Sequence, residues 1–292
     1  MLHQPVASFE PHSPAMSDMA KGTASATPDT LSVPARHRVI REGEQPEHIH
    51  LLLSGMACRF RIQRDGTRQI IAFLFPGDFC DLQLFGTSEY AVSTLNVCKF
   101  TLFPRAQLAT LAQQDTSLAL ALLRESAREM GMMREWLVTM GSGKAERQLA
   151  HLFCELHARL ATCSEPGALT YSLPVTQADV ADALGLSPVH VNRVLMLLRK
   201  RGLVSWSGGV LTLLDPAALE SLAEFNSDYL PPKGRSAATR VALQNALARS
   251  HKGGAESDSA QPGPIGAEIV PQWAVPQRLV VRSDEDLEQE AS

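Results

Sequence analysis

The sequence predicts an α+β protein: a compact antiparallel β-roll, then a long helix, then two short helices with a β-hairpin. Three observations predict this order. Short β-type runs broken by turn residues fill 33–103, an apolar stripe of helical period starts after Pro104, and two helical patterns meet at Gly185 before a Ser-Gly-Gly turn. The length of 292 residues and the hydrophobic content of 45% suit about two domains with a sizeable core.

Composition limits the classes of function. Acidic residues outnumber basic ones by 31 to 27, so any nucleic-acid contact must come from a local patch. No apolar run reaches the roughly 18 to 20 residues that span a bilayer, and the N-terminus lacks the pattern of a signal peptide. A cytoplasmic protein without membrane contact is therefore expected. The five cysteines form no CxxC pair, which argues against a disulfide framework and a zinc knuckle, and no metal site is expected.

The chain is expected to divide into five segments. These are a disordered tail (1–30), a β-roll domain (31–109), a long helix with a hinge (110–141), a second globular domain (144–230) and a mostly disordered tail (231–292). The C-terminal tail is compatible with one short helix over 237–249 and no stable core.

The β-roll is predicted from runs of β-formers. They are HIHLLLSG, MACRFRIQ, RQIIAFLF and VSTLNVCKFTLF, with turns at Asp65-Gly66 and Pro76-Gly77. In MACRFRIQ (56–63) the alternation predicts that the side chains at 58, 60 and 62 face the core. Those at 59, 61 and 63 are expected to face water.

From Arg105 the apolar period becomes helical, over a helix of about 30 residues. An identical helix from a second subunit could cover its apolar seam. The seam residues expected in this homodimer are Leu118, Leu122, Met130, Met133, Leu137 and Met140. The stripe could instead pack only on the β-roll, and both arrangements could hold on different sides, because Leu123 and Trp136 lie off the seam. Gly141-Ser142-Gly143 then predicts a hinge.

A helix-turn-helix is predicted within TQADVADALGLSPVHVNRVLMLLRK. Thr176 and Asp179 form an approximate capping box at the start of the first helix, and Gly185 suits a left-handed turn at its end. Ser187 is a natural N-cap and Pro188 a natural first helical residue for the second helix. Two helices joined in this way can place the second one in the DNA major groove.

The outward face of the second helix carries base-reading chemistry. The apolar residues Val191, Val194 or Leu195, and Leu198 are expected to face inward, which leaves Asn192 and Arg193 outside. Arg193 could donate two hydrogen bonds to guanine, Asn192 could pair with adenine, and the free N–H groups near Ser187 suit a phosphate. The expected DNA-contacting residues are Thr176, Gln177, Ser187, Pro188, Val189, His190, Asn192, Arg193 and Ser207.

The surroundings of these helices agree with DNA contact. Residues 176–206 hold four basic residues (Arg193, Arg199, Lys200 and Arg201) against two acidic ones (Asp179 and Asp182), a local balance of +2. The run LVSWSGGVLTLL predicts a hairpin, in which Ser207 could touch phosphate. Double-stranded DNA is the expected partner.

This order of elements resembles the Crp/Fnr family of bacterial transcription regulators. The resemblance covers about 33–228 and rests on EGEQPEHIHLLLSGMACRF, on FPGDF and, most specifically, on TQADVADALGLSPVHVNRVLMLLRKRGLV, whose HVNR recognition helix is typical of one branch. It implies a cyclic-nucleotide-binding-like β-roll, a dimerisation helix and a winged helix-turn-helix. It also implies a homodimer on a roughly palindromic DNA site, and a contact with RNA polymerase if the protein is an activator.

The sensor half departs from the family's cyclic-AMP binders. After GDF they carry a Gly-Glu pair and later an Arg-Ser pair, whereas this chain has Cys80-Asp81 and Ser88-Glu89. A buried phosphate would lack its guanidinium partner, so cyclic AMP is not expected in the usual mode. No cysteine precedes Cys58, so the N-terminal type of iron-sulfur cluster is not expected, and no cofactor is predicted.

The signal that controls the protein is left open. Cys80, Asp81 and Ser93 are the candidate residues of an effector pocket, and Cys80 is the candidate for redox sensing or haem ligation. Cys58, Cys80 and Cys98 could equally be small core residues. No enzyme motif such as a Walker loop or HExxH is present, so an enzyme is not expected. The alternative is a ligand- or redox-sensing module whose helix-turn-helix contacts protein.

Overall fold

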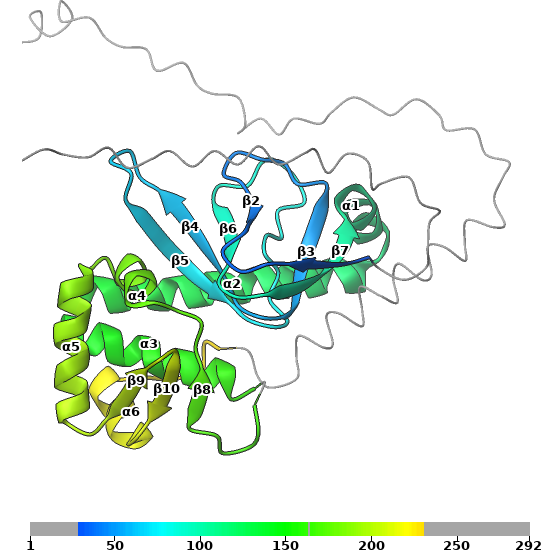
Figure 1. Cartoon of the computed structure of the whole chain (residues 1–292). Helices are drawn as coiled ribbons and strands as arrows, with labels where there is room; N and C mark the ends of the chain where they lie inside the picture. The colour runs from blue at the N-terminus through cyan, green and yellow to red at the C-terminus, as the bar shows by residue number, and fades with distance from the viewer. Residues whose placement is uncertain (1–28, 163, 231–292) are drawn as a thin grey trace, which may run out of the picture. The chain divides into compact units, whose positions relative to one another are not determined.

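A computed structural model describes residues 29–162 and 164–230, which belong to one compact unit (Figure 1). The predicted tails, the helix expected over 237–249 and Cys163 lie outside the described residues, apart from 29–30.

Between Thr30 and Pro104 the described chain forms antiparallel sheets, as the β-type runs predicted. The strands are β1 (Thr30–Val33), β2 (Arg38–Ile40), β3 (His48–Ser54), β4 (Ala57–Ile62), β5 (Arg68–Leu74), β6 (Ala91–Thr94) and β7 (Cys98–Pro104). One sheet has the order β1-β7-β3 and the other β2-β6-β4-β5. The run VSTLNVCKFTLF is therefore two strands in different sheets. The break comes at Asn96, whose side-chain oxygen accepts the backbone N–H of Met56 at 2.7 Å.

The predicted facing of β4 is wrong at two positions. Arg59 was expected in water but is only 3% exposed, and Ile62 was expected in the core but is exposed. The pairing of β4 with β5 shifts between Arg59 and Phe60, which disturbs the simple alternation. Arg59 is buried at low cost because its guanidinium donates to the carbonyls of Phe79 and Cys80, both at 2.7 Å.

The predicted single helix is two helices, α1 (Arg105–Gln114) and α2 (Thr116–Ser142). Asp115 separates them in an extended conformation, and its carboxylate accepts the backbone N–H groups of Ser117 at 2.9 Å and Leu118 at 3.2 Å. An aspartate followed by threonine and serine is a helix start signal, which the apolar stripe masked. Gly143 ends α2 in an extended conformation, and its action as a hinge stays a prediction.

The second half follows Gly143. Its elements are α3 (Ala145–Leu160), β8 (Thr170–Ser172), α4 (Gln177–Leu184), α5 (Pro188–Lys200), β9 (Val204–Ser207), β10 (Val210–Leu213) and α6 (Pro216–Ala223). The predicted hairpin is β9–β10, and the short β8 adds a third strand in the order β8-β10-β9. A continuous hydrophobic cluster links Ile70 and Phe73 of β5 to Val180 of α4 and Phe153 of α3.

Candidate nucleic-acid interface

Helix α4 begins with the predicted capping box. The Thr176 hydroxyl accepts the backbone N–H of Asp179 at 3.1 Å, and the Asp179 carboxylate accepts the backbone N–H of Thr176 at 2.9 Å. Gly185 ends the helix with φ 65° and ψ 30°, a left-handed conformation that a glycine adopts without steric penalty. Both predictions from local sequence are confirmed.

Helix α5 begins and packs as predicted. Ser187 is its N-cap and accepts the backbone N–H of His190 at 3.2 Å, and Pro188 is its first residue. The apolar positions predicted to face inward are all buried: Val191, Val194, Leu195 and Leu198. These contacts fix the rotation of α5 about its axis, so the opposite side chains must point outward.

The outward face of α5 is open to solvent. Val189 is 81% exposed, and Asn192, Arg193 and Met196 are also exposed. The Asn192 amide donates to the side-chain oxygen of Gln177 at 3.1 Å, which joins the start of α4 to the middle of α5. Arg193 makes no ion pair within the described residues, so its guanidinium can contact an external acceptor.

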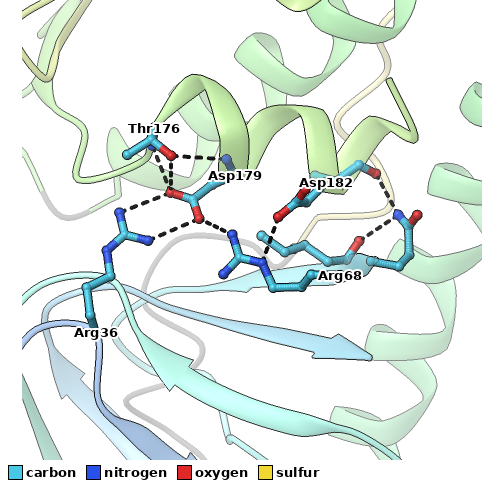
Figure 2. Close-up of polar contacts among 8 residues, drawn as sticks. Arg36, Arg68, Thr176, Asp179 and Asp182 are labelled. Carbon is cyan, nitrogen blue, oxygen red and sulfur yellow. Dashed lines mark hydrogen bonds and ion pairs between the residues drawn. The ribbon is translucent and has the colours of Figure 1, made fainter. Parts of the chain in front are cut away.

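The charges around α5 are arranged asymmetrically. Arg201 pairs with Glu146 at 2.6 Å, and Arg199 donates to the Trp206 carbonyl, which ties α5 to β9. The two acidic side chains of α4 bind arginines of the β-roll (Figure 2). The acidic groups are therefore neutralised there, while Arg193 keeps an uncompensated charge.

The remaining predicted DNA contacts lie at the ends of these elements. Thr176 and Gln177 occupy the N-terminus of α4, and Ser187 and Pro188 the N-terminus of α5; all except the half-buried Gln177 are exposed. His190 is half-buried in the first turn of α5. Ser207 is exposed beside the tight turn at Gly208 and Gly209, whose φ values are 57° and 73°. The first turn of α5 offers backbone N–H groups, and Ser187 and Ser207 offer hydroxyls, both of which suit phosphate.

The three candidate effector residues do not lie open to solvent. Cys80 and Asp81 are buried, and Ser93 is half-buried on β6. Burial raises the pKa of the Cys80 thiol far above its usual range and that of Cys58 to about 12. Because thiolates are the reactive form, these cysteines are placed as core residues, which weighs against Cys80 as a redox sensor.

A cavity that the sequence analysis missed lies among β5, α2 and α3. Its lining includes Arg59, Glu129, Trp136, Glu155 and Arg159, but not Cys80, Asp81 or Ser93. The indole N–H of Trp136 donates to Glu155 at 2.7 Å, and Arg59 pairs with Glu129. Burial raises the pKa of Glu155. The only sequence signal was an arginine on a strand and polar residues on the inner side of helices, a pattern shared with many cores.

The predicted seam on α2 divides into two parts. Leu118 and Leu122 are 2% and 8% exposed, because they pack on Phe79 and Phe103 in the chain's own core. They are therefore core residues and not part of a free seam, which corrects the prediction for these two. The later seam positions are exposed: Met130, Met133, Leu137 and Met140. Leu123, expected off the seam, is exposed as well.

Comparison with known proteins identifies both halves. Residues 30–115 match a cyclic nucleotide-binding domain, and residues 147–222 match a Crp-like helix-turn-helix domain. The nitrogen fixation regulation protein FixK of Bradyrhizobium diazoefficiens is 27% identical over 185 residues, which are 63% of this chain and 78% of that protein. The transcriptional activator protein FnrL of Cereibacter sphaeroides is 27% identical over 180 residues, covering 61% and 73%.

A solved structure agrees. FixK2 from Bradyrhizobium japonicum superposes with a TM-score of 0.63 at 26% identity, over 67% of this chain and 96% of that one. Among the described residues, no helix has the length and apolar character needed to cross a membrane. The matched domains, their order and the relatives agree with the predicted resemblance: this chain belongs to the Crp/Fnr family and is a DNA-binding regulator of transcription, not an enzyme.

Proposed function

We propose that two copies of this chain bind a roughly palindromic DNA site, with one α5 helix in each of two successive major grooves. The observation that carries this proposal is the outward face of α5. Asn192 and Arg193 are exposed there, while buried residues on the opposite side fix their direction. A rigid helix with an unpaired arginine on its exposed face suits base reading better than a flexible loop would.

Each exposed group has a role in this proposal. Arg193 donates two hydrogen bonds to guanine O6 and N7, and Asn192 contacts adenine after releasing Gln177. Val189 offers an apolar contact to a thymine methyl group. The backbone N–H groups in the first turn of α5, from Val189 on, and the Ser187 hydroxyl position a phosphate, while Thr176 sets the start of α4 through its capping box.

The exposed part of the α2 seam would join the two copies. Met133 and Leu137 are each half or more exposed. A large apolar stripe exposed to solvent is typical of a protein–protein interface. We expect Leu137→Glu to give monomers in analytical ultracentrifugation, because a carboxylate would be buried at the centre of the contact. Val97→Glu is the matched control, since Val97 is 61% exposed on the β-roll; a dimeric Leu137→Glu protein would contradict this assignment.

The DNA-binding proposal is tested by selecting genomic fragments bound by the purified protein and measuring affinity by fluorescence anisotropy. Arg193→Ala should weaken binding to the selected site. Arg61→Ala is the matched control, because Arg61 is an exposed arginine that pairs with Glu42 at 2.9 Å on the β-roll. Undiminished binding by Arg193→Ala removes Arg193 from base reading. Failure of the wild-type protein to select any fragment favours the alternative of a module whose helix-turn-helix contacts protein.

The proposal also covers whether this chain activates or represses transcription, and which effector controls it. FnrL is named as a transcriptional activator, so we propose that this chain activates transcription in the cytoplasm through contact with RNA polymerase. We propose that the effector is not cyclic AMP, because this chain has Cys80-Asp81 and Ser88-Glu89 where the family's cyclic-AMP binders carry a Gly-Glu and an Arg-Ser pair. Titration calorimetry with cyclic AMP should give no binding heat. Cys80→Ser should show the same DNA affinity as the wild type, with and without peroxide.

A further inference from the structure

The first helix of the helix-turn-helix is held by two arginines of the β-roll (Figure 2). Arg36 lies in the turn between β1 and β2, and Arg68 is the first residue of β5. They reach Asp179 and Asp182 of α4, which are 111 to 143 residues away in sequence. These contacts therefore connect the sensor half directly to the DNA-reading half.

We call the contacts of Arg36 and Arg68 with Asp179 and Asp182 the clamp, and their geometry is specific. The two terminal nitrogens of Arg36 each lie 3.0 Å from one carboxylate oxygen of Asp179, a bidentate arrangement. Arg68 places Nη2 2.5 Å from Asp179 Oδ1 and Nε 2.7 Å from Asp182 Oδ2. The side chain of Asp179 is only 1% exposed, so its charge depends on these partners and on Thr176.

Two further features make the clamp more than a surface ion pair. Arg36 has a φ of 58°, a left-handed conformation uncommon for an arginine, and in this turn its side chain reaches Asp179. The Gln69 amide donates to the backbone carbonyl of Ala183 at 3.2 Å, near the C-terminal end of α4. The β-roll therefore holds α4 near its start, at its middle and near its end.

The clamp leaves the reading face free. It engages Asp179 and Asp182 of α4, whereas Asn192 and Arg193 lie on α5 and stay exposed in the same structure. Since α4 and α5 share one core, fixing α4 also fixes the direction of α5. A dimer that reads two half-sites at once needs both α5 helices correctly directed, and fixing them before binding lowers the entropy cost of association.

Resting on the proposed DNA binding, we infer that Arg36 and Arg68 are positioning residues for DNA recognition, acting through Asp179 and Asp182 on the orientation of the helix-turn-helix. Without the clamp, the second half would keep its fold but be held on the β-roll mainly by the apolar cluster that includes Ile70 and Val180, so its direction would be less fixed. The expected signature is a loss of affinity for the full palindrome, with little change in base preference.

The test is a charge exchange at the Arg68–Asp182 pair, which leaves the Thr176–Asp179 capping box in place. Arg68→Glu should weaken binding to the full site about 5- to 50-fold, a usual range for coupling between two sites. Adding Asp182→Arg should recover part of that loss, because opposite charges face each other again at this pair while the contact of Arg68 with Asp179 stays lost. Arg61→Glu is the matched control on the same hairpin and should leave affinity unchanged, since Arg61 pairs within the β-roll.

The readouts separate positioning from simple stability. Hydrogen exchange of the α4 amides should quicken in Arg68→Glu and slow again in the double variant, while the protein stays folded by circular dichroism. If Arg68→Glu does not fold, Asp182→Asn removes one charge of the pair and should weaken binding by a smaller factor. Unchanged or tighter binding by a folded clamp variant overturns the inference. If Arg193→Ala still weakens binding in that case, the proposed function stands and only the clamp fails; if Arg193→Ala also binds fully, base reading by α5 fails too.

Discussion

Two buried arginines of the β-roll and one exposed arginine on the outward face of α5 have opposite uses. In the β-roll, Arg59 and Arg105 are buried, and each donates hydrogen bonds to several backbone carbonyls. On α5, Arg193 is exposed and makes no ion pair within the described residues. The same type of side chain is thus an internal donor at Arg59 and Arg105 and an uncommitted donor at Arg193.

The difference shows how to distinguish arginines that stabilise the fold from arginines that are available for binding. A buried guanidinium must have its donors satisfied inside the fold, since an unsatisfied buried polar group is costly. An exposed guanidinium without a partner contributes little to folding, and its effect appears when an external acceptor arrives. Substitutions of the buried and of the exposed, unpaired arginines should therefore change different measured quantities.

The largest effect is expected at Arg105. Arg105→Ala would leave the carbonyls of Pro46, Leu84 and Gly86 without their donor, because Arg105 bonds to all three. We expect the free energy of unfolding in urea to fall by about 3 to 5 kcal/mol. Arg105→Lys should recover only part of this, since an ammonium cannot span the same set of acceptors. A loss below about 1 kcal/mol would mean that the loop has another support.

Next in size is a pH effect at His50, another buried basic group of the β-roll. Burial, aided by the nearby His48, lowers the pKa of His50 to about 4 from its ordinary 6.5. Between these values the unfolded chain binds a proton that the folded chain does not, so stability falls as the pH falls. The loss from this group is roughly 3 kcal/mol on going from pH 7 to pH 4. His50→Leu should flatten this slope in denaturation experiments; equal slopes would contradict the assignment.

A change in the reading half should affect DNA affinity alone. Arg193→Ala should cost about 1 to 3 kcal/mol of binding free energy per half-site and relax the base preference at one position. Its unfolding free energy should be close to that of the wild type, because the side chain is exposed and makes no ion pair within the described residues. Anisotropy and urea denaturation on the same protein check both parts. A marked loss of stability would show that Arg193 supports the fold, as Arg59 and Arg105 do.

The smallest effect is expected at Arg201. It pairs with Glu146 at 2.6 Å, but its side chain is 51% exposed, and water competes for both charges. Arg201→Ala should lower the unfolding free energy by less than about 1 kcal/mol. A loss as large as that of Arg105→Ala would show that exposure does not separate the two classes of arginine.

The helix-turn-helix could be predicted residue by residue because its signals are local. Thr176, Gly185, Ser187 and Pro188 each act on backbone groups within a few positions, and the structure has all four in the predicted roles. The β-roll was predicted only as a class of fold. The direction of Arg59 depends on a register shift against β5 and on carbonyls about twenty residues later, which no local pattern records.

Two further differences have the same origin. The apolar stripe of α2 does not tell which part packs on the β-roll, because Leu118 and Leu137 look alike in the sequence but have opposite exposure. The capping role of Asp179 could be predicted from Thr176, which lies three residues before it. Its arginine partners lie more than a hundred residues away, so only the three-dimensional structure joins them.

The acidic pair on α4 also sets a condition for building chimaeric regulators from this chain. A foreign DNA-binding half grafted after Gly143 would meet Arg36 and Arg68 with whatever residues occupy the positions of Asp179 and Asp182. A graft with carboxylates there would inherit the connection to the sensor. A graft without them would leave two arginines facing no acceptor. A working chimaera therefore needs the contacting surface of α4 as well as the linker between the two halves.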